Sequence, residues 1–209
     1  MEAEYAPRRY TVEEYFALEE RGDARHEFFE GEVFAMAGES TAHNLIALNI
    51  AAELRVAVRG RGCRVFMEGI QLAVREGRHY AYPDVMVTCD PDDLQAPRRV
   101  RHPVLLVEVL SPSTAAYDRR QKFRQYKQLS TLRHYLLVSQ SQWLVEWFRR
   151  TPEDGWLYEA LTGPAERLAI PELNLDLTVA QIYEDAGVAP LRLTPPPTDD
   201  DAESPDTDY

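Results

Sequence analysis

The segment 103–110 (PVLLVEVL) constrains the fold more than any other stretch of this 209-residue chain. It is apolar on both faces of a predicted strand, apart from Glu108, and this pattern is typical of a central strand covered on both sides. A lone carboxylate in such a strand is costly unless it is paired, hydrogen-bonded or bound to a metal. Glu108 therefore belongs either to a structural salt bridge or to a functional site.

Helices and strands are predicted on both sides of this segment. Thr11, with Glu14 three residues later, predicts a capping box and a helix over 12–21. A long amphipathic helix should begin at Ser40 or Thr41 and run to Val58. We expect its buried side to consist of Leu45, Leu48, Ile50, Ala52, Leu54 and Val58. Further helices are predicted over 114–130 and 178–186. Strands are predicted over 26–36 (a hairpin around Glu30-Gly31), 63–68, 70–75, 83–89, 103–110, 134–140, 143–149 and 156–161.

This order of elements predicts a mixed α/β domain in which helices flank a central sheet. The length suits a single domain, which we place at residues 1–190. Residues 191–209 are rich in Pro and Asp and offer almost nothing to bury, so we expect a disordered acidic tail.

The net charge of −12 argues against a nucleic-acid partner, because phosphate binding normally uses Lys and Arg. Part of this charge lies in residues 195–209, which hold six acids and no Lys or Arg. Without those acids the net charge is −6, so the objection is halved and not removed.

Membrane insertion and secretion are not expected. No apolar run approaches the ~20 residues that a membrane helix needs, and the N-terminus lacks the apolar segment of a secretory signal. Cys63 and Cys89, the only two cysteines, stand 26 positions apart without zinc-site spacing. We therefore expect two reduced thiols and a cytoplasmic protein.

Asp84 is the second candidate for chemistry. It follows Tyr82-Pro83, and since proline is tolerated at the start of a strand, Asp84 should lie at a strand entrance. Successive strands are usually neighbours, so Asp84 and Glu108 are expected close together. Two carboxylates from adjacent strands form a hard-oxygen site suited to Mg²⁺ or Mn²⁺, which could support phosphodiester hydrolysis. Taken alone, Asp84 has a simpler explanation as the cap of a turn.

Lys122 is the third candidate. Lys122 and Tyr126 stand at i and i+4 of the predicted helix over 114–130 and share a face with Asp118. Because this helix follows the strand of Glu108, the lysine could polarise an attacking water or hold a phosphate oxygen. The alternative is a solvated basic face with an ion pair between Asp118 and Lys122.

These residues together resemble a known family. The matching blocks are Tyr82-Pro83-Asp84-Val85, then 107–114 (VEVLSPST), then Asp118 with Lys122 and Tyr126, and upstream 26–32 (HEFFEGE) with His43-Asn44. They resemble the bacterial restriction endonuclease family of the Uma2/DUF820 type, in the PD-(D/E)XK nuclease superfamily. The resemblance covers about residues 10–185. It implies an αβββαβ core around a mixed sheet, with an extra N-terminal hairpin and C-terminal strands.

The resemblance also implies a site. Asp84 would be the superfamily aspartate, Glu108 the acid of the (D/E)XK motif, and the Val109 carbonyl a third metal ligand. Leu110 stands where the superfamily has its lysine, so Lys122 on the following helix becomes the candidate. Glu27 is the upstream acid to carry over, with Glu30 and Glu53 as lesser options.

Four further residues are expected to support this site. His43 could contact substrate, or it could serve in capping or core packing. Gln71 could lie on the sheet face near the metal, or it could be a polar strand residue facing water. Asp118 and Tyr126 share the face of Lys122.

The leading hypothesis is a Mg²⁺- or Mn²⁺-dependent endonuclease acting on DNA. Two basic stretches could contact phosphate: Arg98, Arg99 and Arg101, and the face of Arg119, Arg120, Arg124 and Lys127. A two-fold dimer would double such a surface. The alternative is a catalytically inactive nuclease fold that serves as a binding or assembly module. Convergence of Asp84, Glu108 and Lys122 favours the enzyme, and a lysine pointing away favours the module. A hydrolase of small phosphorylated substrates would instead show a closed pocket.

Overall fold

The computed structural model describes residues 8–22, 24–36, 38–111 and 118–191, so the predicted acidic tail lies almost wholly outside the described residues. The helical elements are α1 (Val12–Arg21), α2 (Thr41–Ala57), α3 (Pro91–Gln95), a π-helical turn η1 (Asp118–Lys122), α5 (Phe123–Tyr126), a 3-10 turn η2 (Pro171–Leu173) and α6 (Val179–Ile182). The strands are β1 (His26–Phe29), β2 (Glu32–Ala35), β3 (Arg64–Met67), β4 (Gln71–Arg75), β5 (His79–Ala81), β6 (Val85–Thr88), β7 (Arg99–Val100), β8 (Pro103–Leu110), β9 (His134–Ser139), β10 (Val145–Arg150), β11 (Trp156–Leu161), β12 (Arg167–Ile170) and β13 (Leu175–Thr178).

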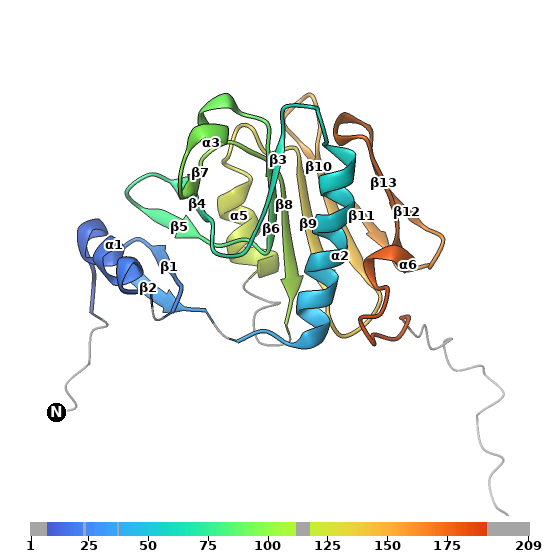
Figure 1. Cartoon of the computed structure of the whole chain (residues 1–209), viewed down its shortest axis with the longest axis horizontal. Helices are drawn as coiled ribbons and strands as arrows, with labels where there is room; N and C mark the ends of the chain where they lie inside the picture. The colour runs from blue at the N-terminus through green and yellow to red at the C-terminus, as the bar shows by residue number, and fades with distance from the viewer. Residues whose placement is uncertain (1–7, 23, 37, 112–117, 192–209) are drawn as a thin grey trace, which may run out of the picture.

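The central sheet has six strands in the order β11-β10-β9-β8-β6-β3. Strand β8 lies between β6, to which it is antiparallel, and β9, to which it is parallel, so the sheet is mixed. The chain reaches β9 from β8 through η1 and α5. The series α2, β3, β6, β8, α5, β9 therefore gives the αβββαβ order that the resemblance implied (Figure 1).

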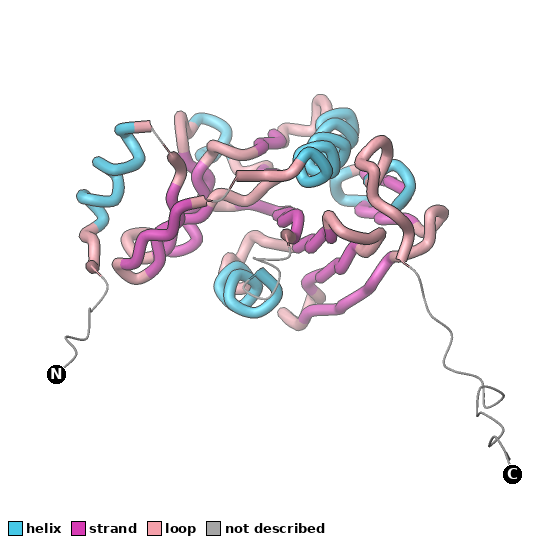
Figure 2. Tube along the Cα trace, turned by 90° about the horizontal axis from the view of Figure 1, so that it is seen from below, coloured by secondary structure: helices cyan, strands magenta, loops and turns pink. Residues whose placement is uncertain are grey.

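Both faces of this sheet are covered, as the apolar pattern of 103–110 predicted. Leu105, Val107 and Val109 of β8 pack in the cluster that contains α2 and α6. Leu106 and Leu110 point to the other face, into the cluster that contains Tyr126 of α5. Figure 2 shows helices on both sides of the sheet. Glu108 alternates with its neighbours and belongs to the α5 side, which puts it on the same face as Leu106 and Leu110.

Helix α2 begins after Ser40, whose side chain accepts a hydrogen bond from the His43 backbone N–H. Its buried face differs from the predicted one. Ile50 and Leu54 are buried as expected, but Leu48 is 48% exposed and Ala52 is also exposed. The buried positions follow the 3.6-residue period from Ile46, and Leu48 lies two residues, about 200°, round the helix from it.

A smaller sheet and α1 form the N-terminal part, at the left of Figure 1. The capping box of Thr11 and Glu14 is present at the start of α1, as predicted. Strands β1 and β2 form the expected hairpin, and its two turn residues have positive φ, 49° at Glu30 and 92° at Gly31. Such values match the type I′ turn, whose twist suits a two-residue hairpin. The sheet continues through β5, β4 and β7.

The segment after β8 departs from the prediction of one regular helix over 114–130. Residues 112–117 lie outside the described part, and the described helix is a π-helical turn, Asp118–Lys122, followed by α5, which ends at Tyr126. The wider π turn changes the angular spacing of side chains, so the i, i+4 pattern alone could not place Lys122. Single π turns occur often at functional sites.

Several short elements were not predicted from the sequence. They are β5, α3, β7, β12 and β13, each between two and five residues long. Segments of this length carry too few residues for a hydrophobic period, and their pairing depends on distant strands. Within the described residues, no helix is long and apolar enough to cross a membrane.

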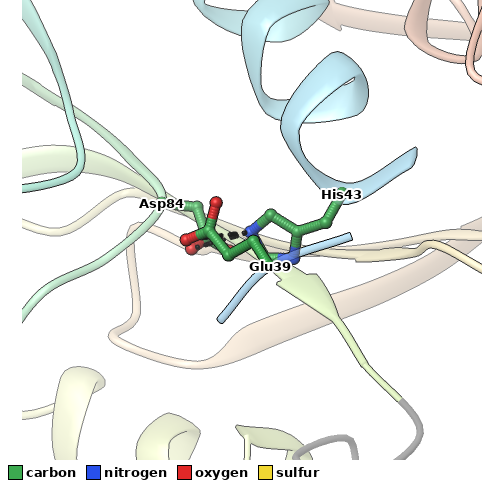
Figure 3. Close-up of side chains that lie close together, drawn as sticks. All are labelled: Glu39, His43 and Asp84. Carbon is green, nitrogen blue, oxygen red and sulfur yellow. Dashed lines mark ion pairs between the residues drawn. The ribbon is translucent and has the colours of Figure 1, made fainter. Parts of the chain in front are cut away.

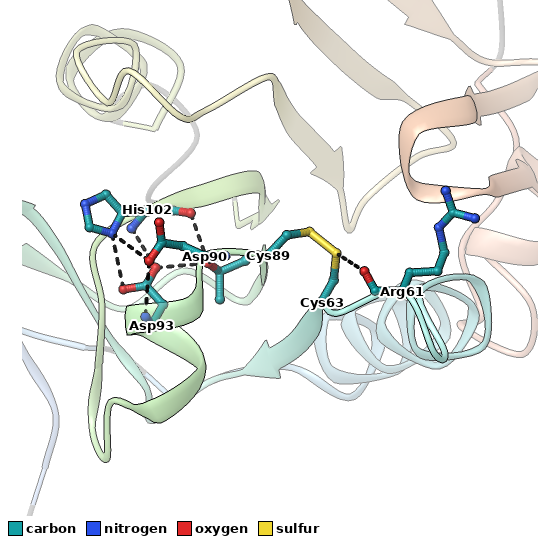
Figure 4. Close-up of a disulfide and its surroundings, with 7 residues drawn as sticks. Arg61, Cys63, Cys89, Asp90, Asp93 and His102 are labelled. Atoms are coloured by element: carbon teal, nitrogen blue, oxygen red, sulfur yellow. Dashed lines mark hydrogen bonds and ion pairs between the residues drawn. A yellow bond between two sulfur atoms is a disulfide. The ribbon is translucent and has the colours of Figure 1, made fainter.

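Cys63 and Cys89 form a disulfide, so the expectation of two reduced thiols was wrong (Figure 4). Cys63 directly precedes β3 and Cys89 directly follows β6. The neighbouring residues Arg64 and Thr88 form the last pair between these two antiparallel strands. The antiparallel register therefore puts the cysteines opposite each other, with Cα atoms 4.0 Å apart. Spacing along the chain does not reveal such a pair, because it depends on register. The disulfide also removes the observation on which a reducing compartment was expected.

Removing this disulfide should destabilise the protein without altering its fold. The bridge closes a loop with a sequence separation of 26 residues, for which the chain-entropy relation gives about 3–4 kcal/mol. The double variant Cys63→Ser/Cys89→Ser should lose that amount of unfolding free energy in urea denaturation. Wild-type protein under reducing conditions should lose a similar amount. Equal stability of the oxidised and reduced proteins would show that the bridge does not constrain the unfolded chain.

Candidate active site

The candidate site lies where β6 begins and β8 ends. Val85 of β6 pairs with Val107 of β8, so Asp84 and Glu108 stand opposite each other one position further along. This confirms that the two strands are neighbours. Both carboxylates are buried, with exposures of 5% for Asp84 and 4% for Glu108. The N-terminal end of α2 and the π turn after β8 approach the same end of the sheet (Figure 1).

The two oxygens of Asp84 have different partners. Oδ2 accepts a hydrogen bond from the Val109 backbone N–H at 2.5 Å, where β8 extends beyond the first pair of β6. Oδ1 lies 3.2 Å from Nε2 of His43 on α2. Asp84 therefore links the end of the central strand to the start of the long helix, so its role is more than the turn cap that was the simpler explanation.

Lys122 points into the site. Its Nζ atom lies 3.2 Å from Oε2 of Glu108, to which it donates a hydrogen bond, and 2.9 Å from Oε1 of Glu27 on β1. All three side chains are buried. The helix after β8 thus brings a lysine to the acid of the central strand, although Leu110 occupies the usual lysine position. Glu27, the upstream acid inferred from the resemblance, lies in the same cluster.

Tyr126 holds the other oxygen of Glu108. Its hydroxyl donates a hydrogen bond of 2.8 Å to Oε1, and the ring is fully buried. Burial and the nearby Glu108 charge raise the pKa of Tyr126 well above its ordinary value, so the phenol keeps its proton and remains a donor. Glu108 is therefore fixed between an ammonium group and a phenol.

Replacing Tyr126 with phenylalanine should destabilise the protein by about 1–3 kcal/mol, since a buried carboxylate loses one hydrogen bond. The measurement is the unfolding free energy in urea. Tyr158→Phe is the matched control, because the Tyr158 hydroxyl also contacts a glutamate, Glu146, but at 3.5 Å and from a side chain that is 56% exposed. If Tyr126→Phe loses as little unfolding free energy as Tyr158→Phe, the hydrogen bond from Tyr126 to Glu108 does not stabilise the protein.

The carboxylates at this end of the sheet are chemically suited to a divalent cation. Glu27, Asp84 and Glu108 are all buried, and Glu27 and Glu108 both contact Lys122. Carboxylate oxygens are the ligands that Mg²⁺ and Mn²⁺ prefer. The chemistry of these side chains therefore fits such an ion.

Gln71 does not face water, so that alternative was wrong, while its nearness to a metal stays a prediction. It is buried, its amide nitrogen donates to the hydroxyls of Tyr15 and Tyr82, and its carbonyl oxygen accepts from Nε of Arg99. These partners belong to the packing between α1 and the N-terminal sheet. Strand alternation could not reveal this, because the partner comes from a helix 56 positions away.

The remaining candidates are less informative. Glu30 lies in the hairpin turn, 4.0 Å from Arg75 and 3.8 Å from Arg78, and Glu53 is exposed on α2. The side chain of Asp118 lies outside the described part of the structure. For Val109, the backbone N–H faces Asp84, while the role of its carbonyl stays a prediction.

Two acids at the site were missed in the sequence. Glu39 precedes α2, and its Oε1 lies 3.6 Å from Nε2 of His43. Glu68 follows β3, and its backbone N–H donates to the Asp84 carbonyl. The i, i+4 spacing of Glu39 and His43 was a usable signal, whereas nothing local marked Glu68.

Comparison with known proteins gives a consistent result. Residues 12–180 match the model of the family described as "Uma2: Putative restriction endonuclease". Two Synechocystis proteins, both named as uncharacterized, are similar to this chain. The protein slr1290 is 36% identical over 178 residues, which cover 84% of this chain and 92% of that protein. The protein sll1609 is 34% identical over 155 residues, which cover 73% of this chain and 88% of that protein.

A solved structure is also similar. It is the crystal structure of a protein from Anabaena variabilis described as "a putative nuclease belonging to DUF820". The TM-score is 0.69 at 17% sequence identity, and the match covers 83% of this chain and 97% of that one. This likeness establishes the restriction-endonuclease-like fold.

Proposed function

This chain belongs to the Uma2 family, and we propose that it is a divalent-metal-dependent endonuclease that hydrolyses phosphodiester bonds in DNA. The observation that carries the proposal is the position of Lys122. Its ammonium group lies within 3.2 Å of Glu108, on the strand next to Asp84. Two carboxylates that can hold a cation and a lysine that can stabilise phosphate charge are groups suited to metal-dependent phosphodiester hydrolysis.

Asp84, Glu108 and the Val109 carbonyl would hold the cation, either Mg²⁺ or Mn²⁺. When bound, the cation would supply Lewis-acid stabilisation of phosphate charge and a lower pKa for a coordinated water. The protein supplies the positions of these ligands. Tyr126 fixes one oxygen of Glu108, and the Val109 N–H fixes one oxygen of Asp84.

We assign to Lys122 the role of acting on the reacting atoms. Its long side chain is held by Glu27 and Glu108, so its ammonium group is oriented before substrate arrives. In that position it would orient the attacking water or hold a phosphate oxygen. Glu27 contacts Lys122 and is a positioning residue.

The basic residues available to DNA are fewer than the sequence indicated. Arg99 and Arg101 form ion pairs with Glu76, and Arg119 forms one with Glu146. Among the side chains that the structure describes, the exposed basic ones that remain from the two predicted stretches are Arg98, Arg124 and Lys127, and the side chain of Arg120 lies outside the described part. We propose that these three contact phosphate and that a two-fold dimer doubles their number on a duplex.

The direct experiment incubates the purified chain with single-stranded, duplex and branched DNA. Each substrate is tested with Mg²⁺, with Mn²⁺ and with a chelator. Cleavage of at least one substrate is expected with either ion, and the chelator should remove it. Absence of cleavage on all three substrates with both ions would overturn the proposal and would favour the alternative of a binding or assembly module.

A further inference from the structure

We propose that Glu39, His43 and Asp84 form a second cation site, which takes a transition metal such as Mn²⁺ and shares Asp84 with the site at Glu108. The inference rests on the proposed function only for the use of the bound ion, because metal binding can be measured without DNA. It assigns a ligand role to His43, for which the sequence suggested substrate contact, capping or packing.

The three side chains converge from separate parts of the chain. Glu39 precedes α2, His43 lies in its first turn, and Asp84 precedes β6. One ligand atom from each lies within 4.8 Å of the other two. Nε2 of His43 lies 3.2 Å from Asp84 Oδ1 and 3.6 Å from Glu39 Oε1, and Figure 3 shows the three side chains directed toward one another. A cation between them would need little rearrangement.

The imidazole of His43 is the strongest indication of a ligand. His43 is 7% exposed, and its Nε2 atom is buried without a hydrogen-bond partner in the described structure. The contacts of this nitrogen with Asp84 and Glu39, at 3.2 Å and 3.6 Å, are ion-pair contacts. A buried imidazole nitrogen directed at two carboxylates without a hydrogen bond is available to a cation that all three share.

The local charge favours a cation. The Glu39 and Asp84 carboxylates lie 3.6 Å and 3.2 Å from Nε2 of His43. Glu68 lies beside Asp84, to whose carbonyl its backbone N–H donates, and its Oε1 is buried without a hydrogen-bond partner in the described structure. Three acidic residues therefore gather near one imidazole.

The N-terminus of α2 does not cancel this field. A helix N-terminus carries about half a positive elementary charge. The three carboxylates carry up to three negative charges, so the balance at the site stays negative. The capped start of α2 serves to fix the direction of His43, since Ser40 accepts its backbone N–H.

The ligand types select the class of ion. Imidazole is a borderline ligand that suits Mn²⁺, Co²⁺ and Zn²⁺, whereas Mg²⁺ prefers oxygen ligands and keeps several waters. A site of one imidazole and two carboxylates should therefore hold Mn²⁺ more tightly than Mg²⁺.

A second cluster of one imidazole and two carboxylates provides the control. Asp90, Asp93 and His102 also bring ligand atoms within 4.8 Å of one another (Figure 4). There, however, Asp93 already accepts hydrogen bonds from Thr88 and from the backbone N–H groups of Arg101 and His102. The side chain of His102 is 40% exposed. Nδ1 of His102 is also buried without a hydrogen-bond partner, so the two clusters differ in the exposure of the histidine side chain and in the hydrogen bonds that already occupy Asp93.

The test is pulsed electron paramagnetic resonance on the full chain loaded with Mn²⁺. Nitrogen coupling from an imidazole is expected in the wild type and in His102→Gln, and it should be absent in His43→Gln. Titration should show Mn²⁺ affinity falling at least about tenfold in His43→Gln and in the exposed variant Glu39→Gln, since even outer partners of a metal site contribute that much. Circular dichroism would verify that each variant is folded.

Two results would overturn the inference. The first is a wild-type spectrum without nitrogen coupling, and the second is coupling that survives in His43→Gln and disappears in His102→Gln. Failure of the nuclease proposal would look different. If the wild-type protein is inactive on DNA but shows nitrogen coupling from His43, the nuclease proposal fails while the inferred metal site is supported. The variant Glu108→Ala should lose DNA cleavage and retain the nitrogen coupling.

Discussion

Replacing Glu108 with alanine is expected to lower the single-turnover rate of DNA cleavage by at least about 1,000-fold, which corresponds to about 4 kcal/mol of transition-state stabilisation. The variant loses one of two carboxylates proposed to hold the cation. It also loses the group that Lys122 and Tyr126 both contact, so the geometry of the lysine is released. Asp84→Ala should have an equal effect, because the second carboxylate and the contact with Val109 disappear together.

Glu146→Ala is the matched control for Glu108→Ala. Glu146 is also a buried strand glutamate bound to a basic side chain, Arg119, but it lies on β10, two strands away from β8. The Glu146→Ala variant should cleave DNA at the wild-type rate. Cleavage by Glu108→Ala at the rate of this control would remove Glu108 from the catalytic site, provided both proteins are folded by circular dichroism.

Replacing Lys122 with methionine is expected to lower the cleavage rate by about 100- to 1,000-fold, the usual loss when one positioned donor is removed. Methionine keeps much of the side-chain volume but not the charge. Lys122→Arg should rescue little, because the planar guanidinium does not reproduce a compact ammonium group between Glu27 and Glu108.

Lys122→Met should also be less stable than the wild type. A second variant is therefore needed to separate the loss of stability from the loss of cleavage rate. Lys122→Met leaves Glu27 and Glu108 buried without their cation, and such losses cost about 3–5 kcal/mol. The double variant Glu27→Gln/Lys122→Met removes one of these charges and should recover part of the unfolding free energy in urea. Its cleavage rate should stay low. Recovery of the rate together with stability would show that Lys122 has only a structural role.

The sequence predicted the parts of the site that depend on local pattern. Glu108 was conspicuous because one carboxylate interrupts a strand that is apolar on both faces, and its burial on β8 follows from that pattern. Asp84 followed from the proline before it and from the adjacency of successive strands. Neither inference needed knowledge of distant contacts.

Features that depend on tertiary register were beyond such reasoning. The disulfide required the pairing of β3 with β6, and Gln71 required the packing of α1 against the N-terminal sheet. Lys122 was identified by resemblance, but its reach depended on a π turn that no periodicity indicates. The side chain that the sequence placed least securely is thus the one whose position supports the proposed function most.

The measurement that tests the central claim most directly compares wild type and Glu108→Ala on closed-circular DNA with Mn²⁺, under single-turnover conditions and after identical purification. A circular substrate responds only to endonucleolytic cleavage, and parallel purification removes contaminating nucleases as an explanation. The account predicts nicked and linear products from the wild type and intact circles from Glu108→Ala. Equal cleavage by both proteins, or none by either, would contradict it.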